Sequence, residues 1–253
     1  MTKPFLDHRS PIPFAHRGGA SAAPENTLAA FQYAVDEGYT YVETDVHATA
    51  DGVLIAFHDD RLDRVTDRTG LIAELSWREV REARVDGSEP IPLFEELLTT
   101  WPDLRVNVDP KADRSVEPLI EVIGRTGALD RVCVGAFSDR RIDRIRDALG
   151  GDLCTGMGPR QVAKLAAAAT GVPFLGRFRS DCAQVPVKQG PLPLVTRRFI
   201  ETAHDHGVAV HVWTIDDAPE MERLLDLGVD GIMTDRPSVL REVLVARGQW
   251  DST

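Results

Sequence analysis

Short apolar runs alternate with longer segments in which apolar residues recur every three or four positions, along almost the whole chain. Residues 12–15 and 41–46 predict two strands, 27–37 a helix between them, and 53–57 a short extended piece. Further helices are expected over 93–100, 116–125, 140–149, 161–169, 196–206, 219–227 and 237–245. Further strands are expected over 104–108, 131–137, 153–155, 173–176, 208–213 and 231–234, with a weak one near Val185.

The alternation predicts an α/β fold. About eight β/α units in 253 residues favour a closed (β/α)8 TIM barrel, one domain over residues 1–253. Residues 60–92 interrupt the alternation with a turn-rich stretch, a short helix from Ser76 and a loop at 86–90, so we expect a small insertion there, after the second strand. An open doubly wound sheet is the alternative, but no Gly-x-Gly-x-x-Gly follows the first strand, and nothing supports dinucleotide binding.

Charge and hydropathy narrow the classes of partner. The net charge of −11 and the pI near 5.1 argue against nucleic-acid binding and against docking on anionic membranes. No apolar run approaches the ~18 residues of a membrane span, and the first 13 residues lack the apolar core of a signal peptide. We therefore expect a cytoplasmic protein without stable membrane association. Its oligomeric state leaves no trace in the sequence.

The cysteines give no spacing signal. The chain has three, an odd number, and no Cys-x-x-Cys, so neither a disulfide framework nor a zinc site is indicated. Cys133 and Cys154 fall in apolar, strand-like segments, and we expect them to be buried free thiols.

Two carboxylates at the end of the second strand carry the most information about chemistry. Glu43 and Asp45 lie two residues apart in a strand-like run, so both side chains point to the same face. Such a pair repels itself unless a positive charge lies between, and a hard divalent cation with oxygen ligands is the usual solution. His16 and Arg17 end an earlier strand, and His58 follows closely. Two imidazoles, an arginine and a metal suggest hydrolysis or transfer at an anionic centre, most plausibly a phosphate ester.

These side chains share one end of the predicted barrel. In such barrels the active face lies at the C-terminal ends of the strands. The chemistry-bearing residues all fall there: His16, Glu43, Asp45, His58, Asp109, Lys111, Phe137 and Trp213. Unselected polar residues would scatter over both ends, so this placement favours a site.

The chain resembles the glycerophosphodiester phosphodiesterase family. The matching stretches are His16-Arg17-Gly18, Pro24-Glu25-Asn26-Thr27, Glu43-Thr44-Asp45-Val46, Asp51-Gly52 with His58-Asp59, Asp109-Pro110-Lys111, Val212-Trp213-Thr214 and Asp230-Gly231-Ile232-Met233-Thr234-Asp235-Arg236-Pro237. Their order and spacing all fit, over residues 14 to 237. The resemblance implies a barrel with a small insertion, a divalent cation (Mg²⁺ or Ca²⁺), and cleavage of glycerophosphodiesters to glycerol 3-phosphate and an alcohol.

The resemblance also implies roles for individual residues. Glu43, Asp45 and Asp109 would be metal ligands, His16 and His58 the general acid/base pair, and Arg17 and Lys111 the phosphate-binding cations. Trp213 and Phe137 would wall the site and contact glycerol carbons. Cations placed where charge builds stabilise the transition state, and histidine suits proton transfer near neutral pH.

Two positions depart from the family pattern. Glutamate is usual where this chain has Asp109, and a side chain one methylene shorter moves the cation or leaves a gap for water. Asparagine is usual where this chain has Asp216, and little effect on the chemistry is expected there.

Several alternatives stay open at the level of the sequence. Glu43 and Asp45 could form ordinary ion pairs, and Lys111 could merely neutralise Asp109. Glu25 could brace a histidine or reach the substrate, and Asp235 is expected to start the last helix. For the whole protein, lysophospholipase D-type cleavage of lysolipids is one alternative. A barrel that binds a phosphate ligand without catalysis is another.

Overall fold

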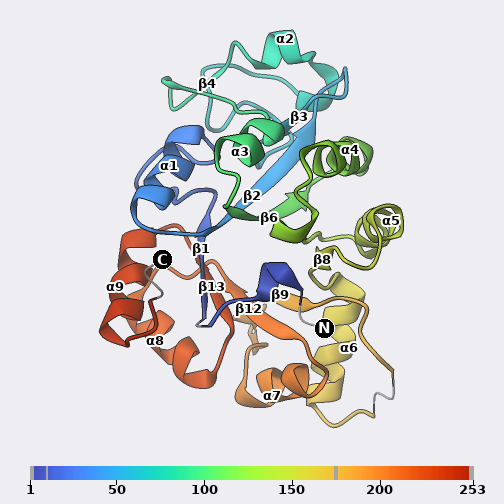
Figure 1. Cartoon of the computed structure of the whole chain (residues 1–253), viewed down its shortest axis with the longest axis vertical. Coiled ribbons are helices and arrows are strands. Elements are labelled where there is room, and N and C mark those ends of the chain that lie inside the picture. Colours follow the sequence, from blue (N-terminus) through green and yellow to red (C-terminus); the bar gives the residue numbers. More distant parts are fainter. Residues whose placement is uncertain (1–2, 10, 174–175, 251–253) are drawn as a thin grey trace.

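A computed structural model describes residues 3–9, 11–173 and 176–250, and in this part of the chain eight parallel strands form a nearly closed barrel (Figure 1). The strands are β1 (Ile12–His16), β2 (Tyr41–Ala48), β6 (Arg105–Pro110), β7 (Val132–Val134), β8 (Cys154–Thr155), β9 (Cys182–Pro186), β12 (Ala209–Trp213) and β13 (Gly231–Thr234). Apart from β8 and β9, each strand pairs with the next in chain order, and β1 also pairs with β13. Only β8 and β9 lack a ladder, and a single bridge between Gly156 and Cys182 joins them. The barrel prediction is confirmed.

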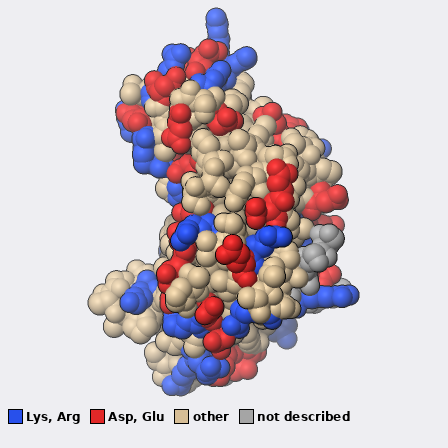
Figure 2. Space-filling model, turned by 90° about the vertical axis from the view of Figure 1, so that its left-hand side faces the viewer, with Lys and Arg blue, Asp and Glu red and all other residues tan. Residues whose placement is uncertain are grey.

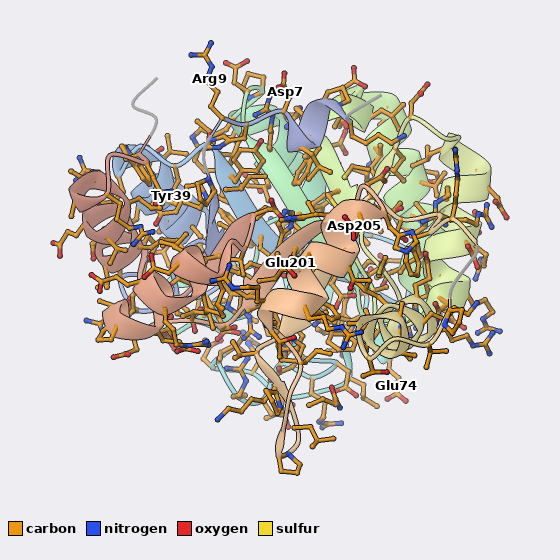
Figure 3. All side chains as sticks on the ribbon, turned by 90° about the horizontal axis from the view of Figure 1, so that it is seen from below. Asp7, Arg9, Tyr39, Glu74, Glu201 and Asp205 are labelled. Atoms are coloured by element: carbon orange, nitrogen blue, oxygen red, sulfur yellow. The ribbon has the colours of Figure 1, made fainter. Side chains whose placement is uncertain are left out.

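One helix follows each barrel strand and packs on the outside. These helices are α1 (Leu28–Asp36), α3 (Phe94–Thr100), α4 (Val116–Thr126), α5 (Asp139–Leu149), α6 (Pro159–Ala169), α7 (Arg197–Asp205), α8 (Ala218–Leu227) and α9 (Pro237–Ala246). The period of apolar residues turns one stripe of each helix inward. On α7, for example, Phe199 and Ala203 are buried, whereas Glu201 and Asp205 lie on the outer face (Figure 3).

Local signals at the helix ends explain why the boundaries fall where they do. The hydroxyl of Thr27 accepts a hydrogen bond from the amide of Ala30 and caps α1. Ser138 and Thr196 cap α5 and α7 in the same way. Gly228 ends α8 in the left-handed conformation that glycine adopts without strain.

The insertion after the second strand forms a small body beside the barrel. It begins beyond β3 (Leu54–Ala56), which pairs antiparallel with β2, and contains η2 (Ile72–Glu74), α2 (Trp77–Val80), β4 (Arg84–Val85) and β5 (Glu89–Pro90). It has its own apolar cluster, which includes Leu62, Ile72 and Val85. Figure 1 shows this body projecting at the top, and Figure 2 shows side chains of both charges over that end. The expected loop at 86–90 is instead the turn and second strand of the β4–β5 hairpin.

The sixth barrel strand is where the sequence prediction was wrong. Of the predicted strand 173–176, residues 174–175 lie outside the described residues, and 173 and 176 belong to no strand. The sixth strand is β9, at the position where only a weak strand was expected. A small hairpin, β10 (Lys188–Gln189) and β11 (Leu192–Pro193), follows it. No helix in the described part of the chain is long and apolar enough to cross a membrane.

Two layers of apolar side chains hold the barrel together. The outer layer lies between strands and helices. The inner one fills the N-terminal part of the barrel with Phe14, Tyr41, Met233 and three cysteines. Phe5, from η1 (Pro4–Leu6), is fully buried against this inner layer. The opposite, C-terminal end is left open, and polar groups collect there.

Candidate active site

A pocket of about 920 Å³ opens at the C-terminal ends of the strands. Every residue singled out from the sequence as a catalytic, binding or metal residue lines it: His16, Arg17, Glu43, Asp45, His58, Asp109, Lys111, Phe137 and Trp213. The barrel thus brings together residues up to 197 positions apart in the chain (213 − 16).

Three buried carboxylates form the floor of this pocket. Glu43 and Asp45 project from β2 and Asp109 from the neighbouring strand β6, where Asp45 and Asp109 are register partners. Lys111 lies between two of them, with Nζ 2.7 Å from Asp45 Oδ1 and 3.1 Å from Asp109 Oδ2. The guanidinium Nε of Arg17 is 3.4 Å from Asp45 Oδ2.

Burial and neighbouring charges shift the pKa values of these groups. Desolvation, together with the neighbouring charge of Asp45, raises the pKa of Glu43 to about 7. Burial also raises the pKa of Asp109, although Lys111 partly offsets it. For Lys111 burial acts in the opposite direction, but the two carboxylates outweigh it and raise its pKa. The pocket floor therefore carries more negative charge than its two cations neutralise at close range.

This donor set fits a hard divalent cation. Asp45 Oδ2 and Asp109 Oδ1 are buried and have no hydrogen-bond partner among the described residues. Carboxylate oxygens are the ligands that Mg²⁺ and Ca²⁺ prefer. As the side chains stand, however, the only three potential ligand atoms in the described residues that lie within 4.8 Å of one another are cysteine sulfurs. A cation shared by Glu43, Asp45 and Asp109 thus requires their carboxylates to draw together.

His16 is held on both sides by carboxylates. Its Nδ1 lies 2.6 Å from Asp235 Oδ1, and its Nε2 lies 3.7 Å from Glu43 Oε2. Burial lowers the pKa of His16, but Glu43 and Asp235 outweigh it, so that the pKa is raised. The expectation that Asp235 starts the last helix was wrong: Arg236 is the N-cap residue of α9, and Asp235 faces His16 instead.

Asp216 positions the carboxylate that holds His16. Its Oδ1 accepts hydrogen bonds from the hydroxyl of Thr234 and from the backbone amide of Asp235. Asparagine also has an oxygen at this position and could accept the same two bonds. Aspartate and asparagine can therefore fill the same structural role at position 216.

A chain of ion pairs connects His58 with Arg17, two residues that line the pocket. Its Nδ1 lies 2.6 Å from Asp59 Oδ1, and Asp59 Oδ2 accepts a hydrogen bond from Arg64 Nε at 2.6 Å. Arg64 also donates to Glu25, which in turn pairs with Arg17. The hydrogen bonds from Arg64 lower the pKa of Asp59 to about 2, so this carboxylate stays ionised beside His58. Glu25 thus pairs with two arginines and not with a histidine, and its contact with a substrate stays a prediction.

The loop after β1 depends on an unusual backbone. Arg17 has φ +52°, and the following Gly18 has φ +83°. A Cβ on Gly18 would lie 2.7 Å from the Cβ of Ala30. This tight turn directs the backbone amide of Arg17 to Glu43 Oε2, at 3.2 Å, so the loop and the carboxylate fix each other.

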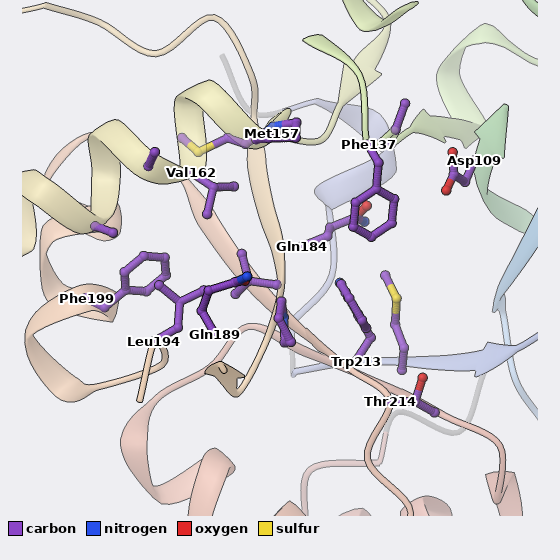
Figure 4. A pocket seen from close by; sticks show the side chains of 18 of the residues that line it. Asp109, Phe137, Met157, Val162, Gln184, Gln189, Leu194, Phe199, Trp213 and Thr214 are labelled. Atoms are coloured by element: carbon purple, nitrogen blue, oxygen red, sulfur yellow. The ribbon is translucent and has the colours of Figure 1, made fainter. Parts of the chain in front are cut away.

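Aromatic side chains wall one side of the pocket. The rings of Phe137 and Trp213 meet edge to face with centroids 5.8 Å apart. Phe137 was expected to end the fourth strand. It lies instead three residues beyond β7 and is 69% exposed. Figure 4 shows both rings between Asp109 and an apolar group formed by Val162, Leu194 and Phe199.

Sequence reasoning missed two residues that complete this site. Asp235 lies 219 positions from His16, and no local pattern links them. Arg64 belongs to the insertion, and its guanidinium pairs with Glu25 and Asp59, which both precede the insertion in the chain. A signal existed only for Asp235, which belongs to a stretch quoted for the family resemblance.

The fold and pocket define a (β/α)8 barrel with an acidic, histidine-flanked site at its C-terminal face. The Glycerophosphoryl diester phosphodiesterase family matches residues 16–239, and the chain belongs to this family. A "Probable glycerophosphodiester phosphodiesterase 2" from Mycobacterium tuberculosis (strain ATCC 25618 / H37Rv) is 42% identical over 99% of this chain and 97% of its own. A lysophospholipase D from Rattus norvegicus is 27% identical over 91% of this chain and 85% of its own.

Solved structures have the same fold. A phosphodiesterase from Oleispira antarctica, solved "in complex with the product sn-glycerol-3-phosphate", superposes with a TM-score of 0.78 over 93% of this chain and 97% of its own. The sequence identity is 22%, so this likeness concerns the barrel alone.

Proposed function

We propose that this chain hydrolyses glycerophosphodiesters to glycerol 3-phosphate and an alcohol, with a divalent cation and two histidines. The observation that carries the proposal is the pairing of two imidazoles, each bound through Nδ1 to a carboxylate, with three buried carboxylates in one pocket. The family, and the name of the 42% identical relative, support the same reaction.

The two imidazoles divide the proton transfers. Asp235 and Asp59 bind the Nδ1 atoms of His16 and His58, which leaves each Nε2 for chemistry. One Nε2 takes the proton of the attacking hydroxyl as its oxygen bonds to phosphorus. The other gives a proton to the alcohol oxygen as its bond to phosphorus breaks. The attacking hydroxyl is either water or the neighbouring hydroxyl of the glycerol, which would give a cyclic phosphate.

Arg17 and Lys111 bind the phosphate oxygens. Both are partly buried cations that line the pocket and already neutralise carboxylates there. They offset part of the negative charge of the pocket floor, and the divalent cation would offset more of it. Because charge builds on the phosphate oxygens in the transition state, these contacts strengthen as the reaction proceeds.

Glu43, Asp45 and Asp109 would hold the cation, as Mg²⁺ or Ca²⁺. When bound, it would supply Lewis-acid polarisation of the phosphate. Asp45 Oδ2 and Asp109 Oδ1, which lack hydrogen-bond partners among the described residues, supply oxygen donors for it.

A panel of glycerophosphodiesters, assayed with and without a chelator, tests the proposal. We expect chelation to abolish turnover and His16→Ala or Glu43→Ala to lower kcat by about 10²-fold or more. Circular dichroism checks that the variants fold. Phosphorus NMR distinguishes the nucleophiles, since a transient cyclic phosphate appears only when the glycerol hydroxyl attacks. Binding of glycerol 3-phosphate without cleavage of any diester in Mg²⁺, Ca²⁺ or Mn²⁺ would establish the non-catalytic barrel instead.

A second candidate, cleavage of lysolipids, is favoured by the apolar side of the pocket. Beyond the aromatic wall the pocket is lined by apolar residues of α6, α7 and the β10–β11 hairpin, among them Val162, Phe199 and Leu194 (Figure 4). Leu192, on the hairpin, also lines it, and 69% of its surface is exposed. An acyl chain is the substrate part that such a lining would accommodate.

Replacing Leu192 with aspartate separates the two substrate classes. Under the lysolipid candidate, Leu192→Asp lowers kcat/KM for a lysophospholipid about tenfold, because a charge then faces the acyl chain. Hydrolysis of water-soluble glycerophosphocholine stays unchanged. Lys188→Asp, on the same hairpin, is the matched control for the added charge. If wild-type protein does not cleave the lysolipid, this candidate fails while the glycerophosphodiester proposal stands.

A further inference from the structure

Three cysteines meet inside the barrel, one layer deeper than the candidate active site. Cys133, Cys154 and Cys182 come from β7, β8 and β9, and all three are buried free thiols. Cys182 precedes the pocket-lining Gln184 by two positions on the same strand, so both point inward. The three sulfur atoms lie within 4.8 Å of one another.

The separation of the sulfurs matches a shared metal ion. Cys133 Sγ lies 3.8 Å from Cys182 Sγ. Thiolates bound tetrahedrally to zinc at about 2.3 Å are themselves spaced about 3.8 Å apart. This pair therefore already has the spacing of two zinc ligands, and the third sulfur lies close enough to join with a small side-chain rotation.

His211 is the candidate for a fourth donor. His211, on β12, is fully buried, and its Nε2 has no hydrogen-bond partner among the described residues. As the side chains stand, the imidazole lies outside the group of three sulfurs, so it would have to draw closer to bind the same ion. A set of three cysteines and one histidine is a common structural zinc site.

The other ring nitrogen of His211 has a partner suited to metal binding. Its Nδ1 lies 3.4 Å from the side-chain amide nitrogen of Gln184. The Gln184 amide nitrogen also donates to Asn107 Oδ1 at 2.7 Å. When Nε2 binds a metal, the ring proton resides on Nδ1, and the oxygen of the Gln184 amide can accept it once the amides of Gln184 and Asn107 both turn over. Gln184 would then fix both the tautomer and the orientation of the imidazole.

The cluster spans the weakest part of the barrel wall. Strand β8 has only two residues, each paired with β7, and a single bridge connects it to β9. The backbone therefore contributes few hydrogen bonds between the fourth and sixth strands. A metal bound by one side chain from each of these strands would hold them together where the ladder does not.

We propose that Cys133, Cys154, Cys182 and His211 form a structural zinc site that closes the barrel between β7 and β9. Binding displaces thiol protons to solvent and involves no change in oxidation state. The ion enters during folding, because the closed barrel buries all four side chains. It is separate from the Mg²⁺ or Ca²⁺ expected on the carboxylates, since thiolates prefer softer metals.

The wild-type protein provides the first test. After purification without added metal and dialysis against EDTA, we expect one zinc per chain by elemental analysis. A mercurial that blocks thiols in guanidinium should release this zinc to a chromogenic chelator in proportion to the cysteines titrated. Refolding with Co²⁺ in place of Zn²⁺ should give thiolate-to-cobalt charge-transfer absorption, which carboxylate ligands do not produce.

Variants assign the ion to the cluster. Cys182→Ser and His211→Ala should lose the zinc and melt at a lower temperature than the wild type, whereas Glu43→Gln, which alters the carboxylate site, should keep zinc and the cobalt spectrum. If a cysteine variant does not fold, the release assay on the wild type decides. Zinc-free wild type with the same melting temperature in the presence and absence of Zn²⁺ would overturn the proposal and leave the cysteines as apolar packing residues. Stoichiometric copper instead of zinc would also overturn it.

Discussion

At the scale of single residues, the site is organised by what holds each imidazole. Asp235 binds His16, and Asp216 fixes Asp235 in turn. The residues expected to do chemistry could be predicted from the sequence, because they follow strand ends in a recognisable order. The residues that hold them in place, such as Asp235, could not be predicted. The hydrogen bond between positions 16 and 235 depends on β1 and β13 being neighbours in the closed barrel.

Replacing Asp235 with asparagine tests whether it positions His16. The amide side chain would keep the volume but lose the charge, so His16 would lose the partner that fixes its tautomer. We expect Asp235→Asn to lower kcat about 10- to 10²-fold with little change in KM, and to shift the pH profile of kcat. Asp230→Asn is the matched control. Asp230 also pairs with a histidine, His204, at 2.7 Å, and neither residue lines the pocket. Equal losses in both variants would indicate a general structural effect.

At the scale of elements, the insertion contributes Arg64 to the ion pairs that support the candidate active site. Its position and its short helix could be predicted, because the β/α alternation stops there. The hairpin of β4 and β5 could not, since two-residue strands show no alternation. The strand β9 was predicted only weakly because prolines and glycines follow it closely, and these residues form the pocket-lining β10–β11 hairpin.

The ion pairs of Arg64 connect the insertion to Glu25, which pairs with Arg17, and to Asp59, which binds His58. Arg64→Ala removes the bonds to Glu25 and Asp59, so His58 and Arg17 both lose part of their support. We expect kcat/KM for glycerophosphocholine to fall several-fold, by less than in a variant without His58. Arg61→Ala is the control, since Arg61 pairs with Asp63 within the same insertion. Steady-state kinetics of both variants, with unchanged melting temperatures, distinguish support of the site from loss of folding. Equal kinetics in the two would contradict this role.

At the scale of the whole molecule, the barrel separates stability from chemistry. Its N-terminal interior is apolar and closed by Phe5, whereas charged groups collect at the C-terminal end. The barrel and the active end could be predicted from the order of strands and helices. The closure by η1 could not, because three residues near the N-terminus carry no periodic pattern.

The closure depends on a buried tyrosine, and this makes stability sensitive to alkaline pH. Tyr41 donates a hydrogen bond to the carbonyl of Phe5 at 2.8 Å and accepts one from Arg105 at 2.7 Å. Burial raises its pKa to about 12, from an ordinary value of 10.0. The folded state therefore keeps this proton between those values while the unfolded state loses it, so stability falls as pH rises, by at most about 1.4 kcal/mol per pH unit.

Tyr41→Phe lacks this ionisation, but loses about 1 kcal/mol at neutral pH with the hydrogen bonds. In urea denaturation, the advantage of the wild type over Tyr41→Phe should shrink above about pH 10 and reverse before about pH 12, the range that the two pKa values define. The partly exposed Tyr33→Phe serves as the control. An advantage that stays constant over this range would show that Tyr41 ionises no differently in the folded and unfolded chain.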